Sequence, residues 1–186
     1  FVYVLLGTGN GTFSAAVPYD TGDGDWASAD VAVADYDGDG NDDLAVTNKG
    51  VYSPAEQPGS VKILWGFGDG TFDDNGPRYT LQTHMYSLAA GNIDADPNQE
   101  LVALSVGSFN LSVLDYVGNR QFQMATPITV RSGAPSASGD FNDHALVNLN
   151  GDSKLGLAVV ASASDAVYVL LGNGNGTFQA ATNYAA

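Results

Sequence analysis

A short acidic stretch, Asp35 to Asp43 (DYDGDGNDD), carries the clearest chemistry in this sequence. Carboxylates at every second position converge only if the backbone wraps around a common centre, and negative charge gathered in this way needs a cation to neutralise it. Ca²⁺ takes about six to eight oxygen ligands in irregular geometry, and Gly40 allows the sharp turn that such a loop requires. The stretch is predicted to be a calcium loop, with its oxygen donors at Asp35, Asp37, Asp39, Asn41 and Asp43.

An internal repeat surrounds this loop. Four segments share an apolar run, a turn and a closing Phe: Val2–Phe13, Val61–Phe72, Leu111–Phe122 and Val167–Phe178. Three further segments, each with a polar loop ahead of an apolar run, lie between them: Ala32–Thr47, Ala89–Ser105 and Ala137–Ala161. The order of features is the same each time, which indicates one structural unit repeated along the chain.

The local signals are those of β-structure. Runs such as Val61–Trp65 and Val167–Leu171 are short, rich in branched residues and bounded by Gly or Asn. The glycine-rich turns (GTGNGTF, GFGDGTF, GNGNGTF) are typical of hairpins. No segment has the apolar period of a helix. The predicted fold class is all-β, with β-propeller blades of four antiparallel strands and about three and a half blades in the chain.

The repeat predicts one domain over residues 1–186, a partial β-propeller. Its blades are expected at about 1–20 (partial), 28–82, 86–131 and 135–186, and the first strand of the last blade is expected near Ser136–Ser138. Closed propellers have about four to eight blades. Further blades are therefore expected from a longer chain or from another copy, and the opening run FVYVLLG is consistent with a piece of something longer.

The pairing of DYDGDGNDDLAV with VKILWGFGDGTF, echoed in VYVLLGNGNGTF, resembles the FG-GAP or VCBS-type repeats of integrin-α-like β-propellers. The resemblance covers nearly the whole chain. It implies that the acidic loop joins the first two strands of a blade and holds one Ca²⁺, and that the protein is secreted or on the cell surface. On that pattern Asn41 provides a backbone carbonyl, and the four side-chain ligands are Asp35, Asp37, Asp39 and Asp43.

A second loop keeps the alternation of oxygen donors: Asn92, Asp94, Asp96, Asn98 and Glu100. Asn92 replaces the first Asp, Pro97 stands at the turn glycine, and Glu100 replaces the last Asp. Both replacements still offer oxygen, so a second calcium site is predicted. The alternative is a loop held by hydrogen bonds alone.

A third loop can be aligned in two ways. Reading forward, Asp140 and Asn142 open the motif, whereas reading back from Leu157 places it at Asn148, Asn150, Asp152, Lys154 and Gly156. The disagreement indicates an insertion. Lys154 is unfavourable beside a cation, so the sequence leaves open whether this loop binds Ca²⁺. If it does, the expected donors are Asp140, Asn142 and Asp152.

Composition limits the partners. The chain has 186 residues, of which 44% are hydrophobic, enough for a real core. Its 21 acidic residues outnumber 6 basic ones, for a net charge of −15, which argues against nucleic acid and against anionic membrane surfaces. Membrane insertion is not expected, because no apolar run approaches the ~18 residues needed to span a bilayer. There is no Cys, which excludes disulfides and thiol chemistry.

These features predict an extracellular, calcium-stabilised module for adhesion, recognition or assembly, which meets a protein or glycan ligand through its propeller loops. Catalysis is not expected, because every clustered carboxylate is better used as a metal ligand. The alternatives are a carbohydrate-binding, lectin-like propeller and an accessory module of a secreted enzyme. In the lectin reading Trp26 stacks on a sugar, although the same side chain could simply fill a blade interface.

Overall fold

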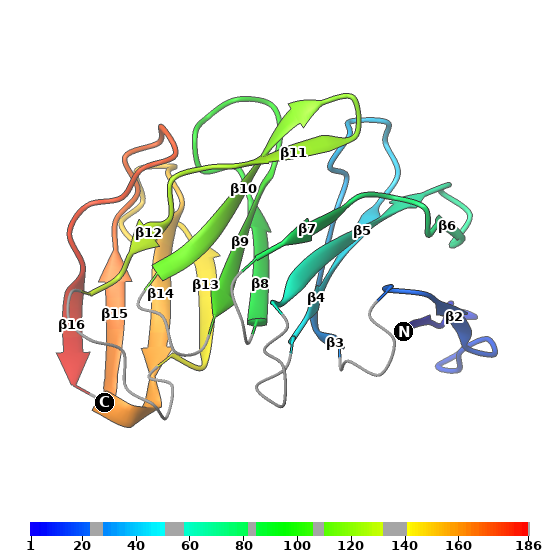
Figure 1. Ribbon diagram of the computed structural model, residues 1–186, viewed down its shortest axis with the longest axis horizontal. Coiled ribbons are helices and arrows are strands. Elements are labelled where there is room, and N and C mark those ends of the chain that lie inside the picture. Colours follow the sequence, from blue (N-terminus) through cyan, green and yellow to red (C-terminus); the bar gives the residue numbers. More distant parts are fainter. Residues whose placement is uncertain (23–27, 51–57, 82–84, 106–109, 132–140, 186) are drawn as a thin grey trace.

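The structure is a computed structural model that describes residues 1–22, 28–50, 58–81, 85–105, 110–131 and 141–185. These residues form antiparallel strands and one short 3₁₀ turn, η1 (Ser162–Ser164). The strands make four separate sheets that stand side by side like the blades of a propeller (Figure 1). Among the described residues, no helix has the length and apolar character needed to cross a membrane. The predicted all-β class is confirmed.

The first sheet is a half-blade of two strands, β1 (Val2–Val4) and β2 (Val17–Tyr19). An isolated bridge between Gly7 and Phe13 closes its glycine-rich turn.

The next sheet, blade 1, has the predicted strand order. Its elements are β3 (Ser28–Ala34), β4 (Asp43–Asn48), β5 (Ser60–Gly66), β6 (Phe72–Asp73) and β7 (Arg78–Thr80). The outer strand is split, with β6 and β7 both pairing with β5. Pro77 lies in the interruption and has no N–H to donate to a neighbouring strand.

Blade 2 repeats this arrangement. Its elements are β8 (Met85–Gly91), β9 (Glu100–Ser105), β10 (Asn110–Gly118), β11 (Gln121–Met124) and β12 (Ile128–Thr129). The sequence predicts one outer strand over Gln121–Val130, but the structure divides it into β11 and β12, with Pro127 in the break.

Blade 3 corrects one prediction. Its strands are β13 (Asp143–Val147), β14 (Gly156–Ala161), β15 (Ala166–Leu170) and β16 (Thr182–Ala185). The strand that pairs with β14 is β13, which begins after the expected position near Ser136–Ser138. Those three residues lie outside the described part of the chain. The extra length therefore precedes β13 and is not an insertion in the loop that follows it.

The core lies between neighbouring blades. Strands β4 and β9 are buried along their whole length, because the sheet on either side covers each face. Phe122 shows how blades 1 and 2 meet. Its ring makes edge-to-face contacts with Tyr36 at 5.7 Å, Tyr79 at 5.9 Å and Tyr116 at 5.3 Å between ring centroids. The closing Phe of a repeat unit thus packs against the blade before it.

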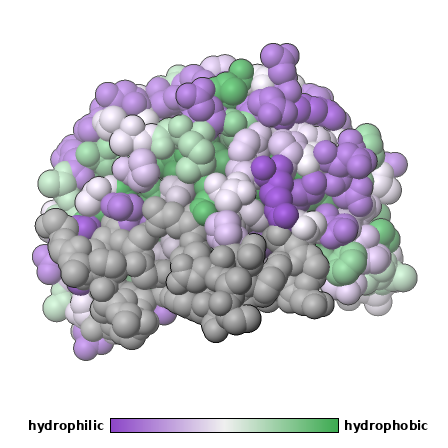
Figure 2. Space-filling model, viewed as in Figure 1, coloured by the Kyte–Doolittle hydropathy of each residue, from purple (hydrophilic) through white to green (hydrophobic). Residues whose placement is uncertain are grey.

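Three loops join the first two strands of blades 1, 2 and 3. We call them loop 1 (residues 35–42), loop 2 (92–99) and loop 3 (148–155). All three lie along one edge of the molecule, uppermost in Figure 1. Figure 2 shows that hydrophilic residues predominate along this edge.

Candidate metal centres

Loop 1 is folded by its own carboxylates. Asp35 accepts hydrogen bonds from the backbone N–H groups of Gly38 at 2.8 Å, Asp39 at 3.1 Å and Gly40 at 2.9 Å. Asp39 in turn accepts from the N–H of Asn41 at 2.8 Å. Gly38 and Gly40 have φ values of 77° and 90°, which glycine adopts at little cost. The alternation of Asp and Gly is therefore a set of consecutive turns.

These turns bring three of the predicted ligands together. Asp35, Asp37 and Asp39 each present a carboxylate oxygen, and the three oxygens lie within 4.8 Å of one another. Such a group of hard oxygen donors is suited to Ca²⁺. The side chain of Asn41 points toward the β5–β6 turn, where its amide oxygen lies against Gly68.

Asp43 lies outside this cluster. It is fully buried at the start of β4, where Oδ2 accepts from the N–H of Tyr36 at 2.9 Å and Oδ1 from the N–H of Gly66 at 2.8 Å. Burial raises the pKa of its carboxyl, and Asp37 and Asp39 add to the increase, while the two hydrogen bonds oppose it. Asp43 therefore fastens loop 1 to β5.

Loop 2 has the same turns without the glycines. Asn92 Oδ1 accepts from the N–H of Ala95 at 2.7 Å, and Asp96 Oδ1 accepts from the N–H of Asn98 at 2.7 Å. Ala95 has a φ of 69°, a left-handed conformation that carries strain for a residue with a Cβ. Asp94, Asp96 and Glu100 present oxygens that also lie within 4.8 Å of one another.

Glu100 distinguishes loop 2 from loop 1. Its side chain is 2% exposed, and Oε2 accepts from the N–H of Ile93 at 2.6 Å. Oε1 has no hydrogen-bond partner among the described residues. Burial is the main cause that raises the pKa of Glu100 to about 7, and Asp94, Asp96 and Asp115 add to it. A buried oxygen without a donor, beside two carboxylates, fits a bound cation.

Loop 3 does not bring Asn142 and Asp152 together, the two predicted donors that lie among the described residues. It follows the backward alignment, with Asn148 Oδ1 accepting from the N–H of Gly151 at 2.8 Å and Asp152 Oδ1 from the N–H of Lys154 at 2.9 Å. Asn142 lies at the opposite end of β13, where its Oδ1 accepts from the N–H of Ser162 at 3.1 Å. The expectation that Asn142 and Asp152 share a site is wrong, because β13 separates them. Asp140 lies outside the described residues, as does Trp26.

One comparison with known protein families identifies part of the chain. Residues 2–46 match the FG-GAP-like repeat. This FG-GAP-like segment runs from the half-blade through β3 and loop 1 into β4, so it contains the first metal cluster. No curated protein matches the chain.

The spacing of the repeat also identifies a carboxylate near loop 2, Asp115, that is not among the donors predicted from the alternating acidic motif. Asp115 on β10 occupies the position that Trp65 has on β5 and Leu171 has after β15, counted from the closing Phe. It lines a cavity of about 240 Å³ together with Asp94 and Glu100. Burial raises the pKa of Asp115, with Asp94 and Asp96 contributing. Alignment of the closing Phe residues was the signal that could have identified this fourth carboxylate.

Proposed function

We propose that the chain is a non-catalytic β-propeller module of an extracellular protein, which binds Ca²⁺ in loops 1 and 2 and uses its loop-bearing edge for adhesion, recognition or assembly. The observation that carries the calcium proposal is Glu100 Oε1, which is buried and unpartnered among the described residues, beside Asp94 and Asp96. The FG-GAP-like match and the strongly acidic composition support the extracellular module.

Calcium, when bound, would supply the positive charge that these loops lack. The protein contributes preformed geometry, since backbone N–H groups already orient one oxygen of Asp94, Asp96 and Glu100. A carboxylate held in this way loses little freedom when it binds a cation. The same hydrogen bonds hold the carboxylates in place as structural groups, which supports a non-catalytic role.

The proposal is tested by thermal melting of the protein in calcium and in EGTA, with elemental analysis of the purified protein. We expect bound calcium and a melting temperature that falls on chelation, because a ligand that binds only the folded state stabilises it by about 2.7 kcal/mol at a concentration of 100 Kd. Unchanged melting together with no bound calcium would overturn the proposal. The partner is to be sought among extracellular proteins and glycans, and further blades in a longer chain or a second copy.

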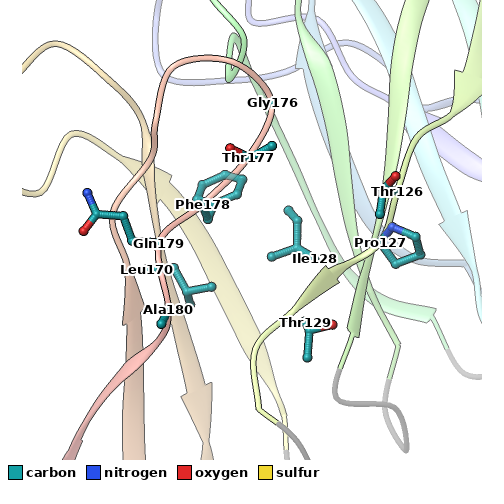
Figure 3. Close-up of a pocket in the computed structure, with 10 residues that line it drawn as sticks. All are labelled: Thr126, Pro127, Ile128, Thr129, Leu170, Gly176, Thr177, Phe178, Gln179 and Ala180. Carbon is teal, nitrogen blue, oxygen red and sulfur yellow. The ribbon is translucent and has the colours of Figure 1, made fainter.

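The carbohydrate-binding alternative has a candidate location. A pocket of about 310 Å³ lies between blades 2 and 3, with residues 126–129 on one wall and residues 176–180 on the other (Figure 3). The ring of Phe178 and the side chains of Thr177 and Thr126 combine an apolar surface with hydroxyl groups, as ligand pockets do. A glycan array tests this alternative, because a module used only for assembly or for protein recognition leaves the array blank. Phe178→Ala should remove any array signal that comes from this pocket.

A further inference from the structure

Arg120 stands where the other units of the repeat have glycine. It lies two residues before the closing Phe122, in the hairpin between β10 and β11, and the residues in the same place are Gly11, Gly70 and Gly176. Those glycines have φ values of 87°, 85° and 76°, and Arg120 has a φ of 58°. A left-handed backbone conformation costs free energy for a residue with a side chain, so an Arg at this position indicates that the interactions of its side chain offset the cost.

The guanidinium of Arg120 reaches loop 1 of the preceding blade. Nε lies 2.6 Å from Asp37 Oδ2, and a terminal guanidinium nitrogen lies 3.3 Å from Asp39 Oδ2. The guanidinium carbon is 5.3 Å from the ring centroid of Trp65 on β5, a distance at which the cation is attracted to the ring face. The side chain of Asp37 is only 6% exposed.

The backbone of the hairpin is held for this contact. The N–H of Arg120 donates to the hydroxyl of Tyr116 at 3.1 Å, and Tyr116 packs against Phe122 in the interface between blades 1 and 2. The Arg120 side chain therefore leaves a fixed point on blade 2 and ends among two carboxylates and one indole of blade 1.

Loop 2 has no such cation from its neighbouring hairpin. The corresponding residue of blade 3 is Gly176, whose N–H donates to the carbonyl oxygen of Ile93 at 3.0 Å. The contact between hairpin and loop is thus kept at both blade interfaces, but a charged side chain is added only where Arg120 replaces glycine.

We propose that Arg120 is a built-in counterion of loop 1. Its guanidinium holds the metal-free loop in shape, fastens blade 2 to blade 1, and competes with Ca²⁺ for Asp37 and Asp39. The competition follows from geometry and charge, since the guanidinium occupies one oxygen of each carboxylate and repels a second cation. The calcium part of this inference rests on the proposed function, whereas the ion pair between blades does not.

Two measurements on Arg120→Gln test the proposal, and they have opposite expected signs. In EGTA the variant should melt several degrees below the wild type, because loop 1 and the blade interface lose their cation. Calcium binding is measured by calorimetric titration in a Glu100→Ala background, which removes the buried ligand of loop 2. In that background Arg120→Gln should bind calcium about tenfold more tightly than the protein that keeps Arg120. A merely structural arginine would lower the melting temperature without raising the affinity for calcium.

Three further variants serve as controls. Asn119→Gly relaxes the adjacent left-handed residue, which has a φ of 54°, without removing a charge, so it should leave both measurements close to wild type. Arg120→Gly relieves the backbone strain of Arg120 and should still melt lower in EGTA than Asn119→Gly. In an Asp37→Asn background, the effect of Arg120→Gln on melting should shrink, because the partner is already lost.

The outcomes separate this inference from the proposed function. Equal melting temperatures of the wild type and Arg120→Gln in EGTA would show that Arg120 is not a counterion of loop 1, whatever the calcium titration gives. If Arg120→Gln melts at a lower temperature but binds calcium no more tightly, the guanidinium does not compete with Ca²⁺ for Asp37 and Asp39. If neither Glu100→Ala nor the Glu100→Ala, Arg120→Gln double variant binds calcium, loop 1 has no calcium site and the competition fails. If the wild type binds no calcium either, the proposed function fails as well. In both cases the melting in EGTA still decides whether the ion pair joins the blades.

Discussion

Glu100 Oε2 accepts a hydrogen bond from the N–H of Ile93 at 2.6 Å, which ties the start of β9 to the second residue of loop 2. Asp43 makes the equivalent bond to the N–H of Tyr36 in blade 1. Asp43 uses its other oxygen on Gly66, whereas the second oxygen of Glu100 has no described partner. Blades 1 and 2 therefore make the same backbone contact. They differ in the second carboxylate oxygen, which is hydrogen-bonded in Asp43 and has no described partner in Glu100.

The first prediction concerns pH. The pKa of Glu100 rises from 4.5 in the unfolded chain to about 7 in the metal-free folded protein, so between these values the folded state binds more protons. The metal-free protein should therefore lose up to about 3 kcal/mol of unfolding free energy as pH rises from 4.5 to 7. Urea unfolding in calcium-free buffer at several pH values measures this.

Glu100→Gln is the matched control for the pH prediction, because it keeps the shape of the side chain and cannot ionise. Its stability should vary less over the same pH range. Equal stability of the metal-free wild type at pH 5 and pH 7.5 would contradict the prediction.

The second prediction separates fastening from metal binding in loop 1. Asp43→Asn should destabilise the protein by about 1–3 kcal/mol in calcium and in EGTA alike, because one buried N–H of Tyr36 or Gly66 then faces an amide NH₂. Asp39→Ala should have its main effect in calcium, where it should reproduce much of the change caused by EGTA. Melting of both variants in both buffers checks this, and a calcium-specific effect of Asp43→Asn would assign Asp43 to the metal after all.

The third prediction concerns Asp115. Asp115→Leu places in blade 2 the residue type that blade 3 has at Leu171. The variant should be more stable than the wild type in EGTA, because a half-buried negative charge beside Asp94 and Glu100 is removed. It should bind calcium more weakly for the same reason. Asp74→Asn, which removes an exposed negative charge, should change neither quantity. Tighter calcium binding by Asp115→Leu would refute the electrostatic argument.

The fourth prediction uses two glycines at equivalent positions of the repeat, Gly172 and Gly7. A Cβ on Gly172 would lie 2.0 Å from the carbonyl oxygen of Leu155, a clash with backbone that loop 3 can relieve only by moving. Gly172→Ala should lower the unfolding free energy by roughly 2–4 kcal/mol. Gly7→Ala should be nearly neutral, because nothing lies within 4 Å of a Cβ there. Chemical denaturation compares them, and equal losses in the two variants would contradict the steric explanation.

Much of the fold was predictable because its signals are local. The runs Val61–Trp65 and Val167–Leu171 identify strands, and the structure has β5 at Ser60–Gly66 and β15 at Ala166–Leu170. The first strand of blade 3 was misplaced, because the polar segment before β13 offered a second alignment of the acidic motif. Pairing of β13 with β14 removes that ambiguity, and pairing is a property of two strands together.

The sequence by itself determined the β-structure, the order of strands within each blade, and the way Asp35 and Asp39 fold loop 1, because these features depend on residues only a few positions apart. The tertiary structure decided which oxygens are available. Asp43 is occupied by Gly66 of β5, Glu100 keeps one oxygen without a described partner, and the loop 1 carboxylates receive Arg120 from the next blade. Charge, burial and hydrogen bonding at these positions depend on residues of neighbouring strands and blades, so they cannot be predicted from the spacing of residues within one motif.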